Sequence, residues 1–284
     1  MHESILQMPA FDAARLTRSV RPKSLLGDQV VLVSDAGECG APRYRVLLAG
    51  DTALTIELGD GIDQHVSATV LALGHRINER RLHGLVETLP TLRSLMVYYD
   101  PLKLPTTSLL AHIDELMRGL KATEQPGRVW KLPVCYHPTV APDLEHVAAR
   151  SSLAPAQVIE RHGAVTYHVY MLGFLPGQAY MGDVPPELAL PRRETPRQRV
   201  AAGSVAIATA LTCIFPLETP CGWHVIGRSP APLWQTRPSP RALLAPGDKV
   251  TFQPISLREY EAHLGKAAEG APRVPWGAPT GAAA

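Results

Sequence analysis

The pattern of apolar and polar positions changes character about midway along the chain. Between residues 44 and 121, two stretches with helical periodicity alternate with pairs of strand-like runs. From residue 165 to about 255 the apolar runs become short and are separated by proline and glycine. The first pattern is typical of a two-layer α/β unit, and the second is typical of a β-barrel or sandwich. The sequence therefore predicts two domains of different class.

The first domain is predicted to follow the order β-β-α-β-β-α. Strand-like runs at 44–50 and 52–59 flank Gly50-Asp51, a dipeptide suited to a tight reversal. Apolar residues then recur every three or four positions in 62–80 and again in 108–121, with two further strand-like runs between them. The residues expected to face the core from these helices are Val66, Val70, Leu73, Ile77, Leu109, Ile113, Leu116 and Leu120.

The second domain is predicted to open with a strand near Val129 and to continue with two short helices, at 141–152 and 152–163. Before it lies a polar segment that contains proline and glycine, as expected of a domain boundary. One apolar run in the N-terminal region, 24–37, fits either a short strand or part of a flexible extension. The expected divisions are an N-terminal extension at 1–42, a first domain at 43–122, a second domain at 128–264 and a disordered tail at 265–284.

Composition narrows the class of protein. The chain has 284 residues, 45% of them hydrophobic, and a formal net charge of +2. Its basic residues are dispersed, so nucleic acid is not an expected partner. No run of about 18 uncharged apolar residues occurs, and the N-terminus lacks a secretory h-region, so we expect no membrane contact and a cytoplasmic location. The four cysteines lack zinc-ligand spacing, and we expect free thiols that only pack.

Four ordered blocks rich in glycine, proline and arginine stand out in the second domain. They cover residues 173–182, 190–197, 200–205 and 220–228. Glycines allow a ligand to approach the main chain closely, and proline stiffens a loop, so the blocks suit a binding site. The alternative is that glycine and proline merely punctuate short strands.

In order and spacing, these blocks resemble the family that includes the B-type subunit of 5-oxoprolinase, allophanate hydrolase subunit 1 and KipI, whose common unit is the carboxyltransferase domain, subdomain C and D. The resemblance implies an α+β chain, with an N-terminal ferredoxin-like α/β sandwich domain followed by a cyclophilin-like β-barrel domain. It also implies a pocket formed by Phe174, Pro176, Gly177, Tyr180, Gly203, Ser204, Pro216, Gly222 and Trp223. The sequence departs from the family pattern at Gln178, Asp183, Ala206, Thr209, Cys221 and His224, which bears on the substrate more than on the fold.

The function implied by the resemblance is that of one component of a hydrolase complex, an ATP-dependent 5-oxoprolinase, inactive alone. The complex converts 5-oxo-L-proline, ATP and water into L-glutamate, ADP and phosphate. The implied partners are a C-type subunit of the allophanate hydrolase subunit 2 class and an A-type subunit of the LamB/YcsF class. ATP is expected to be bound by the complex with Mg, and no intrinsic metal or biotin site is expected. No phosphate-binding P-loop and no kinase motif set occurs in the chain, so it needs such partners to use ATP.

Two further features indicate chemistry. The run 191–199 sets four arginines against one glutamate, and arginine forks bind carboxylate or phosphate with paired hydrogen bonds. We expect Arg192, Arg197 and Arg228 to bind an anion; the alternative is a solvated basic loop or a protein-docking surface. His224 follows Trp223 at a strand start and is the candidate catalytic group, although strand alternation also allows one of the two to be core.

Other functions remain open at this level. The family also suggests a KipI-like inhibitor of a sensor histidine kinase, or one component of a related amide- or urea-processing, carboxyltransferase-like complex. A prolyl isomerase rests on fold analogy alone and ranks last. Ser204 does not fit the G-x-S-x-G nucleophile motif and is expected to be a strand-start residue.

Overall fold

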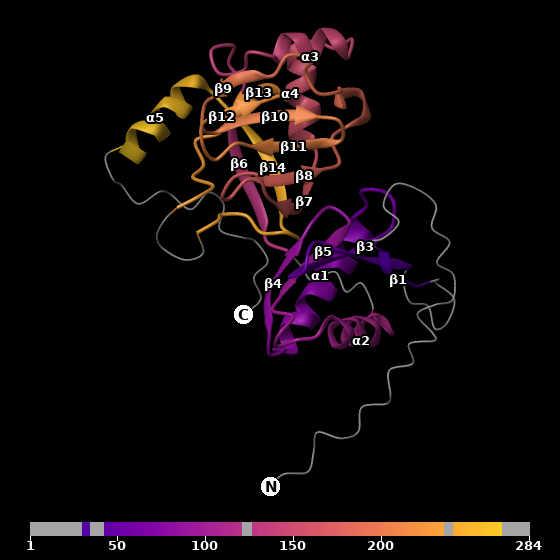
Figure 1. Cartoon of the computed structure of the whole chain (residues 1–284). Helices are drawn as coiled ribbons and strands as arrows, with labels where there is room; N and C mark the ends of the chain where they lie inside the picture. Colours follow the sequence, from indigo (N-terminus) through magenta and orange to yellow (C-terminus); the bar gives the residue numbers. More distant parts are fainter. Residues whose placement is uncertain (1–29, 35–42, 121–126, 236–240, 269–284) are drawn as a thin grey trace, which may run out of the picture. The chain divides into compact units, whose positions relative to one another are not determined.

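The structure, a computed structural model, describes residues 30–34, 43–120, 127–235 and 241–268 (Figure 1). The chain divides into two compact units, 1–123 and 124–284. Among the described residues, no helix combines the length and the hydropathy that a membrane span requires.

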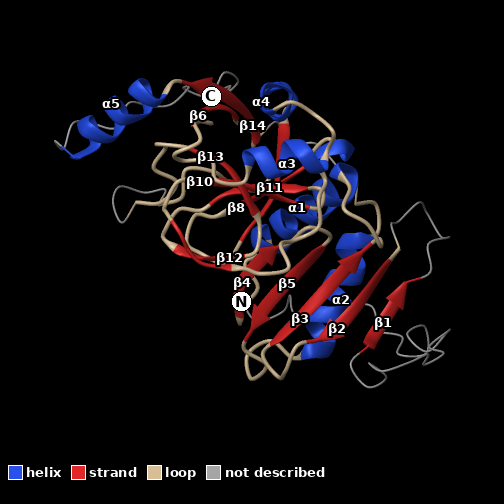
Figure 2. Ribbon diagram, turned by 90° about the horizontal axis from the view of Figure 1, so that it is seen from above, coloured by secondary structure: helices blue, strands red, loops and turns tan. Residues whose placement is uncertain are grey.

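The first unit is one five-stranded sheet with two helices. Its elements are β1 (Val30–Ser34), β2 (Tyr44–Leu48), β3 (Ala53–Leu58), α1 (Gln64–Glu79), β4 (Leu85–Pro90), β5 (Ser94–Tyr99) and α2 (Thr106–Met117). The strands lie in the order β1-β2-β3-β5-β4, each antiparallel to its neighbours (Figure 2). The predicted order β-β-α-β-β-α from residue 44 onward is confirmed.

The helical faces predicted from periodicity form the core of this unit. The residues Val70, Leu73, Ile77, Leu109, Ile113 and Leu116 are buried in one cluster, and Val66 packs against its edge. Helix α1 starts where it does because the Asp63 carboxylate accepts hydrogen bonds from the amides of His65 and Val66. Leu120 is also buried, although α2 ends three residues before it.

The apolar run at 24–37 contributes residues 30–34 as strand β1, which pairs with β2. The other residues of the predicted extension, 1–29 and 35–42, lie outside the described residues. The ferredoxin-like classification of this unit stays a prediction. In the observed sheet, β3 lies between β2 and β5, and β1 extends the edge beyond β2. The next strand after α2 belongs to the second unit.

The second unit is built on a closed seven-stranded barrel. Its elements are β6 (Val129–Cys135), α3 (Leu144–Arg150), α4 (Pro155–Ala164), β7 (Tyr167–Leu172), β8 (Ala179–Gly182), the 3-10 turn η2 (Pro186–Leu188), β9 (Arg197–Val200), β10 (Ser204–Ala208), β11 (Leu211–Ile214), β12 (Thr219–Cys221), β13 (His224–Arg228), β14 (Lys249–Ile255) and α5 (Leu257–Ala268). Around the barrel the order is β10-β11-β8-β7-β14-β6-β13. The predicted helices and barrel class are confirmed, while the cyclophilin-like classification stays a prediction.

Strands β6 and β14 pair in parallel over seven residues and are held together where they begin. The buried Asp248 carboxylate accepts hydrogen bonds from the Arg128 guanidinium (2.8 and 3.2 Å), the Trp130 indole (3.0 Å) and the amides of Arg128 and Ala245. A buried carboxylate is stable only when its lone pairs are matched in this way. Asp248 therefore anchors the start of one strand to the start of the other.

Helix α5 corrects the prediction of a disordered tail from residue 265, because it continues to Ala268; residues 269–284 lie outside the described residues. Its start carries a capping box: the Glu259 carboxylate accepts from the Ser256 amide, and the Ser256 hydroxyl accepts from the Glu259 amide. Tyr260 is buried and fixes the first turn to the barrel unit. The Ser-x-x-Glu spacing was a readable signal for this helix.

A buried histidine lies among the aromatic residues of the barrel unit. His162 of α4 accepts or donates at both ring nitrogens, to the Tyr136 hydroxyl at 2.8 Å and the Thr212 hydroxyl at 3.2 Å. Its ring stacks on Phe252 with centroids 4.7 Å apart. Burial lowers the pKa of His162 to about 3, so this imidazole is neutral at ordinary pH.

We expect His162 to make the barrel unit sensitive to mild acid. Its folded pKa lies below the unfolded value of about 6.5, so the unfolded chain binds the proton first and stability falls as the pH drops below about 6.5. Between pH 7 and 5 the loss from this group is roughly 2 kcal/mol. Urea unfolding followed across this range should show a shallower pH dependence for His162→Gln than for the unsubstituted chain. Identical slopes would assign the acid sensitivity to other groups.

Candidate functional site

The arginine-rich segment 191–197 lies antiparallel along the segment that leads into β13. The His224 Nε2 atom and the Pro191 carbonyl oxygen are 2.9 Å apart, and the Arg193 amide donates to the Gly222 carbonyl at 2.8 Å. Further along, β9 and β12 continue the same antiparallel pairing. The segment therefore pairs with the neighbouring chain along its length, from Pro191 to β9.

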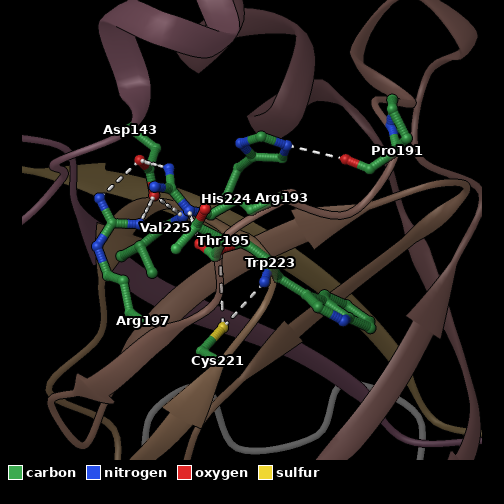
Figure 3. A network of polar contacts seen from close by, with 9 residues as sticks. All are labelled: Asp143, Pro191, Arg193, Thr195, Arg197, Cys221, Trp223, His224 and Val225. Carbon is green, nitrogen blue, oxygen red and sulfur yellow. Dashed lines mark hydrogen bonds and ion pairs between the residues drawn. The ribbon is translucent and has the colours of Figure 1, made fainter.

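Two arginines of the segment 191–197 bind one buried carboxylate (Figure 3). Asp143 accepts from Arg193 Nη1 at 2.7 Å and from both terminal nitrogens of Arg197 at 2.6 and 2.8 Å. The Val225 amide donates to the same carboxylate at 2.7 Å, and the Asp143 amide donates back to the Val225 carbonyl. The Asp143 side chain is 3% exposed, whereas each arginine is about a quarter exposed. Arg197, predicted to bind an anion, is thus bound to an anion of the protein itself.

The third arginine of the segment lies over an aromatic ring. The Arg192 guanidinium carbon is 5.9 Å from the centre of the Trp223 ring, and the Tyr180 ring packs edge-on against that indole with centroids 5.8 Å apart. Arg192 is exposed, and within the described part of the chain no carboxylate pairs with it. The structure thus brings together three predicted site residues, Arg192, Tyr180 and Trp223.

The Tyr180 phenol keeps its proton in this setting. Burial raises its pKa, with smaller contributions from the thiols of Cys213 and Cys221, and the charge of Arg192 acts in the opposite direction. The cluster therefore presents a guanidinium, a neutral hydroxyl and an indole ring. This combination suits a small anion that also has a flat apolar body.

His224, the predicted catalytic group, forms a hydrogen bond at one ring nitrogen and is buried at the other. Its Nε2 faces the Pro191 carbonyl, and its buried Nδ1 has no hydrogen-bond partner among the described residues. The ring stacks on His146 of α3, with centroids 5.4 Å apart. Burial is the main cause of its lowered pKa, so the ring is neutral near pH 7. A catalytic role for His224 stays a prediction.

Several predicted pocket residues belong to the loop between β7 and β8. Phe174 adopts a left-handed backbone (φ 68°) and is 68% exposed, a combination that an aromatic residue rarely adopts without cause. Gly177 also has a positive φ and lies against the Leu233 carbonyl, where a side chain would collide. Pro176 is exposed in the same turn. Among the described residues, no hydrogen bond or ring contact links this loop to Arg192.

Other predicted residues lie elsewhere on the barrel. The Arg228 Nε donates to the Ala202 carbonyl, and its guanidinium lies over the Tyr260 ring rather than over Trp223. Ser204 begins β10, and its hydroxyl donates to the Ala201 carbonyl, as expected of a strand-start residue. Gly203 directly precedes β10, and Pro216 follows β11 by two residues. Their assignment to the pocket stays a prediction.

No group of three or more histidine, cysteine, aspartate or glutamate side chains that suits a metal ion occurs among the described residues. Cys135, Cys213 and Cys221 are buried free thiols, and Cys39 lies outside the described residues. The site offers recognition through the side chains of Arg192, Tyr180 and Trp223.

Comparison with known proteins places this geometry in a family. Residues 44–244 match the family described as carboxyltransferase domain, subdomain C and D. The chain belongs to this family. The family resemblance inferred from the four sequence blocks is thereby confirmed, and the match covers strands β2 to β5 of the sheet and every barrel strand except β14.

Proteins of known name or structure resemble the chain over most of its length. The B-type subunit of 5-oxoprolinase from Bacillus subtilis (strain 168) is 36% identical over 232 residues, which are 78% of this chain and 97% of that protein. The crystal structure of TTHA0988 is 32% identical with a TM-score of 0.65, covering 72% of this chain but only 40% of the other. The urea amidolyase of Lachancea kluyveri is 24% identical over 257 residues, covering 78% of this chain and 14% of that much longer protein.

The residue that sequence reasoning missed is Asp143. Asp143 falls in the first turn of the helix predicted at 141–152, where an aspartate is unremarkable, and its arginine partners lie 50 and 54 residues away. The one signal was the excess of arginine in 191–199, because several cations close together need an anion from elsewhere.

Proposed function

We propose that this chain is the B-type subunit of an ATP-dependent 5-oxoprolinase. In the proposed reaction, 5-oxo-L-proline, ATP and water give L-glutamate, ADP and phosphate. The chain acts with a C-type subunit of the allophanate hydrolase subunit 2 class and an A-type subunit of the LamB/YcsF class, and the complex binds ATP with Mg. The observation that carries the proposal is the 36% identity to a B-type subunit named for 5-oxoprolinase, across 97% of that protein.

The geometry of the site supports this substrate. 5-Oxoproline is a small flat lactam that carries a carboxylate, so it matches a guanidinium beside aromatic rings. Arg192 offers a cation that has no carboxylate partner among the described residues. Trp223 offers the flat apolar face, and Tyr180 a neutral hydroxyl that can donate to the lactam carbonyl. Cleavage of the stable amide is coupled to ATP because phosphorylation of the carbonyl oxygen creates a leaving group.

A related amide- or urea-processing complex is the second candidate, supported by the similarity to a urea amidolyase. Urea has no carboxylate and therefore gives Arg192 nothing to pair with. The regulatory alternative, binding of a sensor histidine kinase, stays a prediction, as does the cytoplasmic location.

The test is reconstitution. This chain is mixed with its C-type and A-type partners, and glutamate release from 5-oxoproline with ATP is measured while each protein is omitted in turn. We expect activity with the full set and its loss when this chain is left out. An assembled but inert set would contradict the proposal, and parallel assays with urea would then test the second candidate.

Within the active complex, we expect Arg192→Ala to raise the KM for 5-oxoproline by about 10- to 100-fold, because one charge-assisted carboxylate contact is lost. Arg192→Lys should recover part of this loss, since lysine keeps the charge but not the planar fork. The matched control is Arg199→Ala in the same segment, where an exposed arginine pairs with Glu218. Equal effects of the two alanine substitutions would remove Arg192 from the site.

A further inference from the structure

The segment 191–197 is fastened on both sides of Arg192 by groups that lie outside it. On one side the His224 Nε2 meets the Pro191 carbonyl at 2.9 Å. On the other, the Asp143 carboxylate holds Arg193 and Arg197 through three hydrogen bonds of 2.6 to 2.8 Å. Of the three arginines in the segment, Arg192 is the one without a carboxylate partner in the described chain (Figure 3 shows the two fastenings).

We propose that Asp143 and His224 are positioning residues that hold this segment so that Arg192 lies over Trp223, ready to bind an anionic ligand. The inference rests on the proposed function only in naming that ligand as the carboxylate of the substrate. The fastening itself concerns contacts within this chain.

The Asp143 carboxylate binds the arginine segment instead of capping its own helix. It stands at the N-cap position of α3, where an aspartate ordinarily accepts from the helix amides, yet it makes no such bond. All four hydrogen bonds to its side chain come from other segments: three from the arginines and one from the Val225 amide. The carboxylate therefore ties α3, β13 and the arginine segment together at one point.

Charge explains why a carboxylate is needed at this point. Arg192, Arg193 and Arg197 lie within six positions of one another, and the guanidinium groups repel each other where the surface is half-buried. Asp143 neutralises one charge and fixes two of the three side chains. Arg192 is then the exposed member, with no carboxylate partner among the described residues.

His224 fits a holding role because of the state of its ring. A neutral ring that donates from Nε2 to the Pro191 carbonyl leaves the lone pair on Nδ1, and that atom is enclosed without a partner among the described residues. An enclosed Nδ1 cannot reach a ligand, whereas the Nε2 bond orients the peptide that directly precedes Arg192. The stacked His146 ring keeps the imidazole in this plane.

The first test is amide hydrogen exchange of the isolated full chain, read in peptides that span 190–200. Asp143→Asn, Arg193→Gln and His224→Phe should each speed exchange in this segment by roughly tenfold or more, since each removes one fastening. Arg193→Gln leaves the Asp143–Arg197 pair intact, so it keeps the test valid if Asp143→Asn fails to fold. His224→Gln keeps a donor near the Nε2 position and should restore slow exchange.

The matched control is Asp248→Asn, which alters the other buried aspartate of the barrel that binds an arginine. It should speed exchange at the start of β6 and β14 and leave 190–200 unchanged. Unchanged exchange in 190–200 for both Asp143→Asn and His224→Phe would overturn the inference. Equal acceleration of that segment by Asp248→Asn would also overturn it, because the effect would then be general loosening.

The second test is kinetic and uses the assembled complex. Asp143→Asn and His224→Phe should raise the KM for 5-oxoproline towards that of Arg192→Ala, with kcat nearly unchanged, and His224→Gln should recover the original KM. A fall in kcat with unchanged KM would overturn the positioning role in favour of a catalytic one. If the unsubstituted complex does not act on 5-oxoproline, the proposed function fails, and the exchange experiment still decides the inference.

Discussion

Replacing Asp248 with alanine is expected to lower the free energy of unfolding of the barrel unit by about 3–5 kcal/mol. The substitution leaves the Arg128 guanidinium without its anion and strips the acceptor from the Trp130 indole and from the amides of Arg128 and Ala245. These groups lie where β6 and β14 begin. Urea unfolding followed by tryptophan fluorescence measures the change, since all four tryptophans of the chain lie after residue 124.

The control is an ion pair of the same kind at the surface. Arg199 and Glu218 pair on the outside of the barrel, with side chains 76% and 51% exposed. Water and salt screen such a pair, so Glu218→Ala should leave the unfolding midpoint unchanged within error. A loss after Asp248→Ala no larger than that after Glu218→Ala would show that the buried carboxylate is not what fastens the two strands.

The second large effect is expected at Gly203, just before β10. Its backbone has φ 83°, and a Cβ atom placed there would lie 2.3 Å from the Ser229 carbonyl oxygen. The surrounding main chain has little freedom to yield, because the Gly203 amide donates to the Phe215 carbonyl and the Ser229 amide donates to the Gly203 carbonyl. Left-handed strain and overpacking together should cost about 3 kcal/mol in Gly203→Ala, measured by the same unfolding experiment.

Gly222 supplies the comparison for this substitution. A Cβ atom at Gly222 would meet nothing closer than Pro196 at 3.8 Å, which is ordinary contact. Gly222→Ala should therefore unfold at nearly the urea concentration of the unsubstituted chain. If both alanine variants lost stability alike, collision at Gly203 would not be the cause, and the requirement for glycine would lie elsewhere.

The elements that sequence predicted correctly are those with a repeated signal. Helix α1 presents Val70, Leu73 and Ile77 on one face over two turns, and this period alone indicates which side is buried. Strands β10 and β13 are short apolar runs bounded by glycine or proline, and such boundaries identify a strand without its partners.

The elements that were not predicted depend on contacts made elsewhere in the chain. Strand β12 has three residues, with Pro220 in the middle, and β9 is mostly exposed and carries two arginines. Neither has a periodicity that can be read, and each exists because the other pairs with it. Helix α5 did carry a capping signal, but glycine and alanine after it indicated a tail.

In the candidate site, too, the residues with a local sequence signal were predicted and those held by distant contacts were not. Arg192, Trp223 and Tyr180 came from local motifs, and the structure brings them together. Strand alternation predicted that only one of Trp223 and His224 faces inward, yet both are buried, because the arginine segment covers this side of the barrel. Asp143 could not be found from spacing, since a hydrogen bond across 50 residues leaves no local pattern.

The parallel pairing of β6 with β14 has a consequence for how the molecule is made. These strands are the first and the last of the barrel, and the paired residues are about 120 positions apart, as in Val129 and Lys249. During synthesis, β6 has no parallel neighbour until residue 255 has emerged from the ribosome, and its free edge stays exposed in the meantime. Closure across so long a loop is slow, so the nascent barrel is the stage at which this chain is most prone to aggregate.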